Sequence, residues 1–427
     1  MSNHNKSQVD ASYVPLGQLA EITMGQSPDS SGYNTNQVGL PFLQGCAEFG
    51  RLSPTAKIYC NPPLRVSKPE SILISVRAPV GTQNWGDVSY CIGRGLSAIK
   101  ARQGIADTKF LSYAISHNID FLHRRSQGST FLAIGAKELR TFPVPNYDFN
   151  TQSKIRIVLQ SVDHAIDKTE ELISKYHKIK IGMMHDLFTR GVNSDGKLRP
   201  CRAQSPDLYK KTSIGWIPND WSTIPFGNVI NIIDPNPSHR YPNESEDGYP
   251  ICSTENFYGS DGFDYSKSKK VSESVYQSQN NRCQFSSLDV IFARKGRLGL
   301  ARRYGAEKKV FSHTVVIMKP LNDKVDPSWL LWLVRSNWFL DGILHEMNTN
   351  LGVPTLGVEF IKGINIPLCS VDEQIQINRA LDKLSEKIHA LEHELAKLER
   401  IKIGLLHDLL TGKATVTYQE GTEITHV

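Results

Sequence analysis

The chain has 427 residues, 39% of them hydrophobic, and a formal net charge of +6 at pH 7. This length exceeds one ordinary hydrophobic core and predicts two or more domains. No stretch of about 18 apolar residues occurs, which argues against a transmembrane helix, and the polar N-terminus lacks the apolar run of a secretory signal. We therefore expect a cytoplasmic protein. The mildly basic balance permits nucleic-acid binding but does not establish it.

The seven cysteines are dispersed along the chain and include no Cys-x-x-Cys pair. Such spacing indicates neither a zinc site nor a disulfide framework. We expect reduced, partly buried thiols and no metal site in this chain.

Residues 1–150 alternate short apolar runs with Gly and Pro turns and include one or two helices. The run SILISVRAPVG (71–81) is an apolar strand that enters a basic, glycine-bearing turn. Asp107 precedes a predicted helix, and residues 142–145 form a predicted short strand. This pattern predicts a compact α/β domain over 1–150.

Residues 151–190 predict one long helix with apolar residues at alternating spacings of three and four, the a/d pattern of a coiled-coil seam. A helix of about 35 residues is about 50 Å long at about 1.5 Å per residue. The expected seam, in which Thr169 also falls, consists of Leu159, Val162, Ile166, Ile173 and Tyr176. Residues 191–220 are polar and rich in Gly, Pro and Ser, and we expect them to be a connector.

The second half of the chain repeats the first. Residues 178–189 read KIKIGMMHDLFT and residues 400–411 read RIKIGLLHDLLT, without a gap and at an offset of 404 − 182 = 222. Upstream, DVIFARKGRLG (289–299) resembles the run at 71–81. The repeat predicts a second α/β domain over 221–370 and a second long helix over 371–412.

The second helix has the purer apolar stripe, formed by Leu381, Leu384, Ile388, Leu391, Leu395 and Leu398. Each stripe alone suits an amphipathic helix that packs on its own domain. Two matched stripes favour packing on each other. We therefore predict a mixed α+β fold in which two α/β domains are joined by two long antiparallel coiled-coil helices, with a pseudo-twofold internal repeat. The tail 413–427 has no apolar periodicity and is expected to be loosely ordered.

Two motifs resemble catalytic sites. Asn61-Pro62-Pro63 matches the start of the motif of amino-methylating DNA methyltransferases, but Leu64 stands where an aromatic ring would stack on the flipped base. No glycine-rich turn for a methyl donor precedes it. The repeated His-Asp pairs at 185–186 and 407–408 lie at helix C-terminal ends, where a histidine suits the helix dipole. We expect a cap or packing role there and no catalytic site in the chain.

Basic residues concentrate near glycine-bearing turns, where arginine can bind phosphate and pair with guanine. We predict a DNA-binding set of Gln44, Arg77, Arg94, Lys100, Arg102, Arg294, Lys295, Arg297, Arg302 and Arg303. The amide side chains of Asn84, Asn256 and Gln279 could also hydrogen-bond to adenine edges. The alternative is that these residues are solvated loop groups. Two similar domains held apart by long helices would contact two separate duplex segments, so a split, asymmetric target with an unread spacer is expected.

Together these features resemble the specificity subunit of type I DNA restriction–modification systems. The resemblance rests on the twin IKIGxxHDLxT helix ends, on Pro367 followed by Asp372-Glu373-Gln374, and on the run 214–221 (IGWIPNDW). It spans almost the whole chain. The first helix departs from the pattern, because it starts with Thr151-Gln152-Ser153 where the family commonly has an acidic residue before Glu-Gln.

The resemblance implies a non-catalytic subunit with two target-recognition domains and two helical spacers that dock two modification (methyltransferase) subunits. Those partners would bring S-adenosylmethionine and adenine N6 methylation, and restriction (translocase/endonuclease) subunits would add ATP- and Mg-dependent translocation and cleavage. Base reading would belong to loops in 33–100 and 244–310. Two alternatives remain: a standalone methyltransferase centred on Asn61, and a coiled-coil scaffold that binds only proteins.

Overall fold

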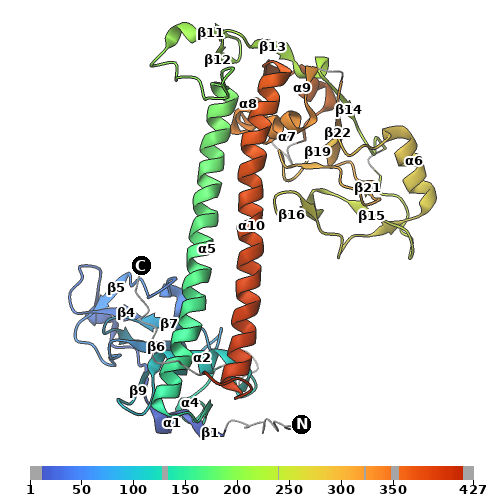
Figure 1. Ribbon diagram of the computed structural model, residues 1–427. Coiled ribbons are helices and arrows are strands. Elements are labelled where there is room, and N and C mark those ends of the chain that lie inside the picture. The colour runs from blue at the N-terminus through green and yellow to red at the C-terminus, as the bar shows by residue number, and fades with distance from the viewer. Residues whose placement is uncertain (1–11, 127–132, 239, 322–323, 348–354, 417–427) are drawn as a thin grey trace, which may run out of the picture. The chain divides into compact units, whose positions relative to one another are not determined.

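The computed structural model describes residues 12–126, 133–238, 240–321, 324–347 and 355–416 (Figure 1). The chain divides into two compact units, unit 1 with residues 1–170 and 393–427 and unit 2 with residues 171–392. Each unit combines one α/β domain with sections of the two longest helices, α5 (Phe149–Thr189) and α10 (Val371–Leu410). We call the two domains head 1 (12–148) and head 2 (222–370).

Head 1 is built on an antiparallel sheet with the strand order β2–β9–β6–β7. All five residues of β6 are buried, which is expected for a strand covered on both faces. The strands of this sheet are β2 (Ala20–Met24), β6 (Ser71–Ser75), β7 (Gln83–Gly86) and β9 (Leu96–Ala101).

A second sheet of head 1 has the order β3–β5–β4–β8, in which β4 and β8 run parallel, and β1 pairs with β10. Four short helices complete the head. The remaining elements are β1 (Tyr13–Pro15), α1 (Leu16–Leu19), η1 (Ser30–Gly32), β3 (Tyr33–Asn34), β4 (Leu40–Leu43), η2 (Cys46–Glu48), β5 (Ile58–Cys60), β8 (Cys91–Ile92), α2 (Thr108–His117), α3 (Asp120–His123), α4 (Ala136–Arg140) and β10 (Pro143–Pro145).

Head 2 repeats the topology of head 1, except that its described strands include no counterpart of β3. Its main sheet has the order β14–β22–β19–β20, its second sheet the order β18–β15–β21 with β15 and β21 parallel, and β13 pairs with β23. These strands are β13 (Ser222–Pro225), β14 (Ile230–Ile233), β15 (Tyr249–Cys252), β18 (Lys270–Val271), β19 (Val290–Ala293), β20 (Ala301–Arg303), β21 (Val310–Phe311), β22 (Val315–Pro320) and β23 (Asn365–Leu368).

Head 2 adds two elements that have no equivalent among the described elements of head 1. One is the hairpin of β16 (Phe257–Tyr258) and β17 (Gly262–Phe263), and the other is helix α6 (Glu273–Cys283). The helices of the shared scaffold are α7 (Pro327–Arg335), α8 (Asn337–Met347) and α9 (Val358–Gly363), and the connector forms a hairpin of β11 (Tyr209–Thr212) and β12 (Gly215–Pro218).

A glycine closes the same hairpin turn in both heads. Gly81 follows β6 with φ +90° and Gly299 follows β19 with φ +80°. A Cβ at Gly81 would lie 2.3 Å from Ile119 Cδ1, and a Cβ at Gly299 would lie 2.4 Å from Leu340 Cδ2. Both the backbone conformation and the close approach therefore require glycine.

The two long helices complete the cores of the heads. In unit 1 the core of head 1 includes Ile155 and Leu159 of α5 together with Leu409 and Leu410 of α10. In unit 2 the core of head 2 includes the equivalent pairs of the other copy, Ile377 and Leu381 of α10 with Leu187 and Phe188 of α5. The leucine end of the repeated motif is thus core, which explains why it recurs.

Within each unit, sections of α5 and α10 lie side by side. Lys402 Nζ lies 2.6 Å from Asp163 Oδ1 in unit 1, and His177 Nε2 lies 3.9 Å from Glu392 Oε1 in unit 2. Every predicted seam side chain, from Leu159 to Tyr176 and from Leu381 to Leu398, is buried or half-buried. The two helices have 41 and 40 residues.

A buried glutamine fixes the start of each long helix. In α5, Gln152 donates to Tyr147 O at 2.8 Å and to Ile105 O at 3.3 Å, and accepts from Asp107 N at 3.0 Å. In α10, Gln374 donates to Lys324 O at 2.9 Å and to Cys369 O at 3.0 Å, and accepts from Asp326 N at 2.8 Å. The two amides bind equivalent loops and are at most 1% exposed.

The prediction of a mixed fold with two similar α/β domains is confirmed. In the described part of the chain no helix has both the length and the apolar character to cross a membrane. The seven cysteines are free thiols, and five of them are buried.

The glutamine clamp predicts a stability effect. Replacing Gln374, which is fully buried, with Ala removes the partner of two carbonyls and one N–H, so we expect a loss of about 2 kcal/mol or more in the free energy of unfolding. Gln152→Ala should have an effect of similar size. Urea denaturation of the full chain measures it, with Gln277→Ala on the exposed face of α6 as the matched control. An equal loss of unfolding free energy in Gln277→Ala and Gln374→Ala would contradict a special role for the buried glutamine.

Candidate nucleic-acid interface

Three loops converge in head 1 at the end of β6. Gly93 N donates to Leu43 O at 2.8 Å, and Gly95 N donates to Gln44 O at 3.2 Å. Val76 N donates to Gly95 O at 2.9 Å, which binds the β6–β7 turn to the other two loops. The cluster brings together Gln44, Arg77 and Arg94, all three exposed.

Head 2 repeats this loop cluster at the end of β19. Ser312 N donates to Cys252 O at 3.0 Å, and Arg294 N donates to Thr314 O at 3.0 Å. Thr254 N donates to Thr314 Oγ1 at 3.3 Å. The β19–β20 turn in this cluster carries Lys295, which is half-buried, and Arg297, which is exposed.

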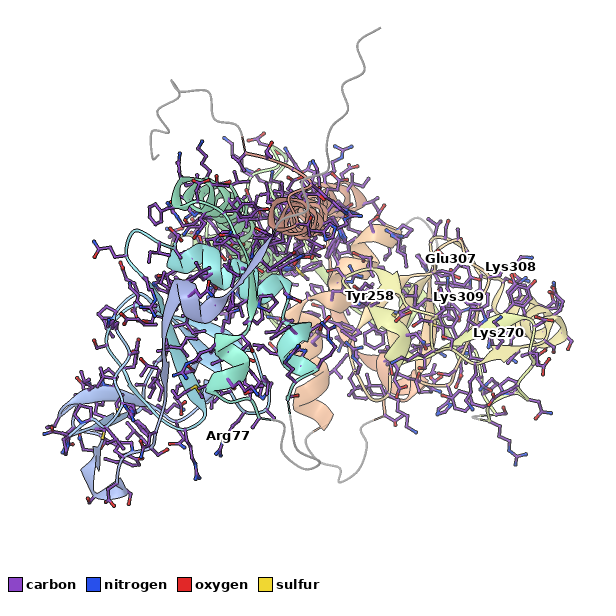
Figure 2. The ribbon with its side chains drawn as sticks, turned by 90° about the horizontal axis from the view of Figure 1, so that it is seen from below. Arg77, Tyr258, Lys270, Glu307, Lys308 and Lys309 are labelled. Carbon is purple, nitrogen blue, oxygen red and sulfur yellow. The ribbon has the colours of Figure 1, made fainter. Side chains whose placement is uncertain are left out.

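Arg77 and Lys295 occupy equivalent positions in the two turns. Each forms an isolated β-bridge to the segment before an equivalent short helix, Arg77 with Ala133 before α4 and Lys295 with Thr355 before α9. Figure 2 shows Arg77 at the margin of head 1. Both heads therefore present a cation at the same point of the scaffold.

Arg294 and Arg302 require a correction, because each is only 5% exposed. Arg294 Nη2 lies 2.5 Å from Asp234 Oδ2 and its Nε donates to His313 O at 3.0 Å. Arg302 donates to Gly259 O at 2.5 Å and to Ala301 O at 2.8 Å. Burial lowers the pKa of Arg302 to about 10, so it remains charged at neutral pH. Both side chains are structural and are not available to DNA.

Three further predicted cations have partners within their own heads. Lys100 Nζ lies 3.2 Å from Glu70 Oε2 and donates to Pro69 O at 3.0 Å. Arg303 donates to the Ser328 hydroxyl, and the exposed Arg102 donates to Gly17 O at 3.5 Å. Of these three, only Arg102 keeps most of its side chain open to solvent.

The amides predicted to read adenine are also engaged internally. Asn84 Nδ2 donates to Gly50 O at 2.6 Å, and Asn256 Nδ2 donates to Asp264 O at 3.0 Å. Gln279 is 5% exposed and exchanges hydrogen bonds with the backbone of Phe311. Only Gln44 remains exposed, with its Oε1 accepting from Ser27 Oγ at 3.0 Å.

Sequence reasoning missed a cationic and aromatic area on head 2. Figure 2 shows Lys270, Glu307, Lys308 and Lys309 gathered on one part of this head. Lys309 is fully buried with its Nζ 4.6 Å from the ring centre of Tyr304, and burial lowers its pKa. Lys308 and Lys270 are exposed. The Lys-Lys doublet was visible in the sequence, but the burial of one member was not.

The catalytic alternatives find no support in geometry. Asn61 is exposed in the loop after β5. His185 and His407 are exposed, and their carbonyls accept from Thr189 Oγ1 at 2.7 Å and Thr411 Oγ1 at 2.6 Å. Each repeated motif thus closes its helix with a threonine. The described residues contain no group of three His, Cys, Asp or Glu side chains that could hold a metal ion.

The remaining exposed groups of the two loop clusters suit a polyanion. Arg77, Arg94 and Arg297 offer guanidinium groups to phosphate oxygens or guanine edges, and Gln44 offers an amide to base edges. Both clusters lie on loops held by a rigid sheet, which is where binding residues commonly occur.

Comparisons with known proteins agree with this geometry. A family profile described as the type I restriction modification DNA specificity domain matches residues 8–175 and 218–400. A relative from Methanocaldococcus jannaschii that bears the name of the type I restriction enzyme MjaX specificity subunit is 39% identical over 192 residues. That match covers 44% of this chain and only 44% of the relative's length.

Two longer matches extend the comparison. The type I restriction enzyme MjaVIII specificity subunit of the same organism is 23% identical over 326 residues, 74% of this chain and 73% of that protein. The crystal structure of a type I restriction–modification S subunit from M. genitalium has a TM-score of 0.58 at 16% identity. It covers 96% of this chain and 98% of that one, so the fold extends over both heads and both helices.

The loop clusters predict stability effects of very different size for two arginines three residues apart. Arg294→Ala removes the largely buried ion pair between Arg294 and Asp234, so we expect the free energy of unfolding to fall by about 3 kcal/mol. Arg297→Ala removes an exposed side chain and should change it by less than about 0.5 kcal/mol. Urea denaturation of the two variants checks this. Equal losses would mean that burial does not separate the two roles.

Proposed function

Because the chain belongs to the family of type I restriction–modification DNA specificity subunits, which are non-catalytic, we propose that its two heads read the two parts of a split, asymmetric DNA target. The observation that carries the proposal is the repeated topology with unlike loops. Both heads present a loop cluster at the end of the equivalent strand, but the exposed groups are Gln44, Arg77 and Arg94 in one and Lys295 and Arg297 in the other. Different groups on the same scaffold would read different bases.

The long helices would form an antiparallel coiled coil that spaces the heads. The pairs Asp163–Lys402 and His177–Glu392 support this arrangement, as does the burial of the predicted seam. The completion of each head's core by the C-terminal turn of the other copy's helix also supports it. A spacer of this kind would leave the bases between the half-sites unread.

The outer part of the repeated motif is a docking surface for modification subunits. Ile181 is 57% exposed and its equivalent Ile403 is 67% exposed, although an isoleucine in a repeated motif is ordinarily a core residue. Ile179 and Ile401 are each 39% exposed. Two equivalent apolar patches suit two copies of one partner, which would cover them.

The chemistry would then reside on the partners. Modification subunits would hold S-adenosylmethionine and methylate adenine at N6, and restriction subunits would use ATP and Mg. Within this chain the described side chains supply recognition and docking groups.

The modular reading predicts the outcome of a domain exchange. The chain is co-expressed with its modification subunit, and methylated adenines are mapped genome-wide. We expect a motif of two short defined segments around a fixed gap. Replacing residues 14–145 with those of a relative should change one segment and leave the other segment and the gap intact, because head 2 and the helices are unchanged.

Three outcomes would contradict this interpretation. A change in both segments would mean that the heads do not read independently. If an assembled, donor-bound complex produced no methylation motif, the alternative of a scaffold that binds only proteins would be favoured. Methyl-donor binding by the isolated chain would instead favour the standalone methyltransferase.

The docking surface makes a separate prediction. Ile181→Glu and Ile403→Glu should each reduce co-purification of the modification subunit, and the double variant should abolish it, because a charge would be buried in an apolar contact. Both side chains are exposed, so the unfolding midpoint should not change. Val88→Glu, at a 48% exposed position of head 1, is the matched control. Full co-purification with the double variant would exclude this surface.

A further inference from the structure

The β16–β17 hairpin of head 2 turns one aromatic ring inward and the next outward. Phe257 is 4% exposed and packs edge-on against Phe263, with ring centres 5.4 Å apart. Tyr258 is 70% exposed. Alternate residues of a strand face opposite sides, so burial of Phe257 directs Tyr258 to solvent.

One buried and one half-buried arginine hold the tip of this hairpin in place. Arg302 donates to Gly259 O at 2.5 Å, and Arg335 donates to Ser260 O at 3.0 Å. Arg335 also forms an ion pair with Asp261 at 2.5 Å. Burial alone would raise the pKa of Asp261, but the Arg335 guanidinium outweighs it and holds that pKa below its ordinary value. The hairpin tip next to Tyr258 is therefore held by several polar contacts.

The hairpin is also tied to the long helix of its own unit. Asp261 Oδ2 lies 3.4 Å from His389 Nε2 on α10. In Figure 1, β16 lies on the α10 side of head 2, and α6 lies on the far side. Figure 2 accordingly shows Tyr258 nearer to α10 than Lys270 and Lys308 are.

Tyr258 lies next to the loop cluster of head 2. The Arg297 guanidinium Nη1 donates to Phe257 O at 3.4 Å and to Thr254 O at 3.5 Å. An exposed arginine, which can bind phosphate, therefore contacts the backbone of the residue that directly precedes the exposed Tyr258. Phosphate contacts position a protein on a duplex, and apolar contacts with base edges contribute to sequence reading.

Head 1 lacks this feature. Its equivalent 3-10 turn, η2, is followed by Phe49 and Gly50, where η5 (Thr254–Asn256) of head 2 is followed by Phe257 and Tyr258. A Cβ at Gly50 would lie 2.4 Å from Ser53 O, so no side chain fits there. An aromatic contact from this place in the scaffold is therefore possible in head 2 only.

We propose that Tyr258 is a specificity-determining DNA contact, whose ring packs against a base edge or deoxyribose in the half-site read by head 2, beside a phosphate contact from Arg297. The proposal rests on the proposed function and adds to it the residue and the chemistry of contact. It makes head 2, and not head 1, the half that carries an aromatic contact.

The test uses the assembled complex with its modification subunit and a duplex that carries the mapped motif. Tyr258→Ala should weaken duplex binding roughly fivefold to a hundredfold and relax base preference at one or two positions of a single half-site. Tyr258→Phe should bind within about twofold of the unchanged complex, because the ring supplies the contact. Leu288→Ala is the matched control, since Leu288 is 53% exposed in the same head but precedes β19 at the end opposite the turn.

A salt series separates the two neighbouring contacts. Tyr258→Ala should leave the dependence of log affinity on log salt unchanged, whereas Arg297→Ala should weaken binding to all sequences and reduce that slope by about 1. Unchanged affinity and preference in Tyr258→Ala, or equal losses in Tyr258→Phe and Tyr258→Ala, would overturn the ring contact. If the complex with unsubstituted Tyr258 reads a split motif while the variants give these results, only the inference about Tyr258 fails. If that complex reads no split motif, the proposed function itself fails.

Discussion

Each long helix begins with a buried glutamine amide that binds backbone groups of its head, and the arrangement of each unit depends on this contact. The amide of Gln152 or Gln374 must face the loop before α2 or α7, and one residue of slippage would turn it by about 100°. A second contact lies 167 − 152 = 15 residues along α5, where Asp167 pairs with Arg51, and 389 − 374 = 15 residues along α10, where His389 meets Asp261. At about 1.5 Å per residue the two contacts are about 22 Å apart. Each head is thus braced against its own helix at two places.

Burial explains which parts of the two halves remain alike. Gly81 and Gly299 recur because both a positive φ and a close side chain exclude other residues. Leu409 and Leu410 recur at Leu187 and Phe188 because they fill equivalent cores. The exposed positions of the loop clusters, such as Arg94, are under no such constraint and are free to differ between the two heads. A common scaffold with unlike exposed groups is what a two-part recognition subunit requires.

Periodicity and repetition were sufficient to predict the two α/β domains and the two long helices, because an offset of 222 and an a/d stripe need no tertiary information. They were not sufficient to sort the basic residues. Arg294 and Arg297 look alike in sequence, and only the fold brings Asp234 to the first of them. The departure at Thr151 also had a structural reason that sequence could not supply. The equivalent residue of α10 is Glu373, whose carboxylate accepts hydrogen bonds from Val192 N and Trp221 Nε1. Glu373 therefore binds the two ends of the connector, a role that Thr151 does not have in α5.

The bracing contacts use opposite charges in the two heads, and this difference bears on recognition. Head 1 supplies a cation, Arg51, which is 53% exposed and pairs with Asp167 and Glu170, so the contact contributes little stability. Head 2 supplies an anion, Asp261, which contacts His389 of α10. The side chain of Asp261 is also paired with Arg335, which is only 12% exposed. The tip of head 2 is therefore the more firmly held. A rigid aromatic side chain loses little conformational entropy on contact, so a firmly held tip is where an exposed tyrosine contributes most to binding. The asymmetry between the half-sites would then originate in the backbone as well as in the side chains.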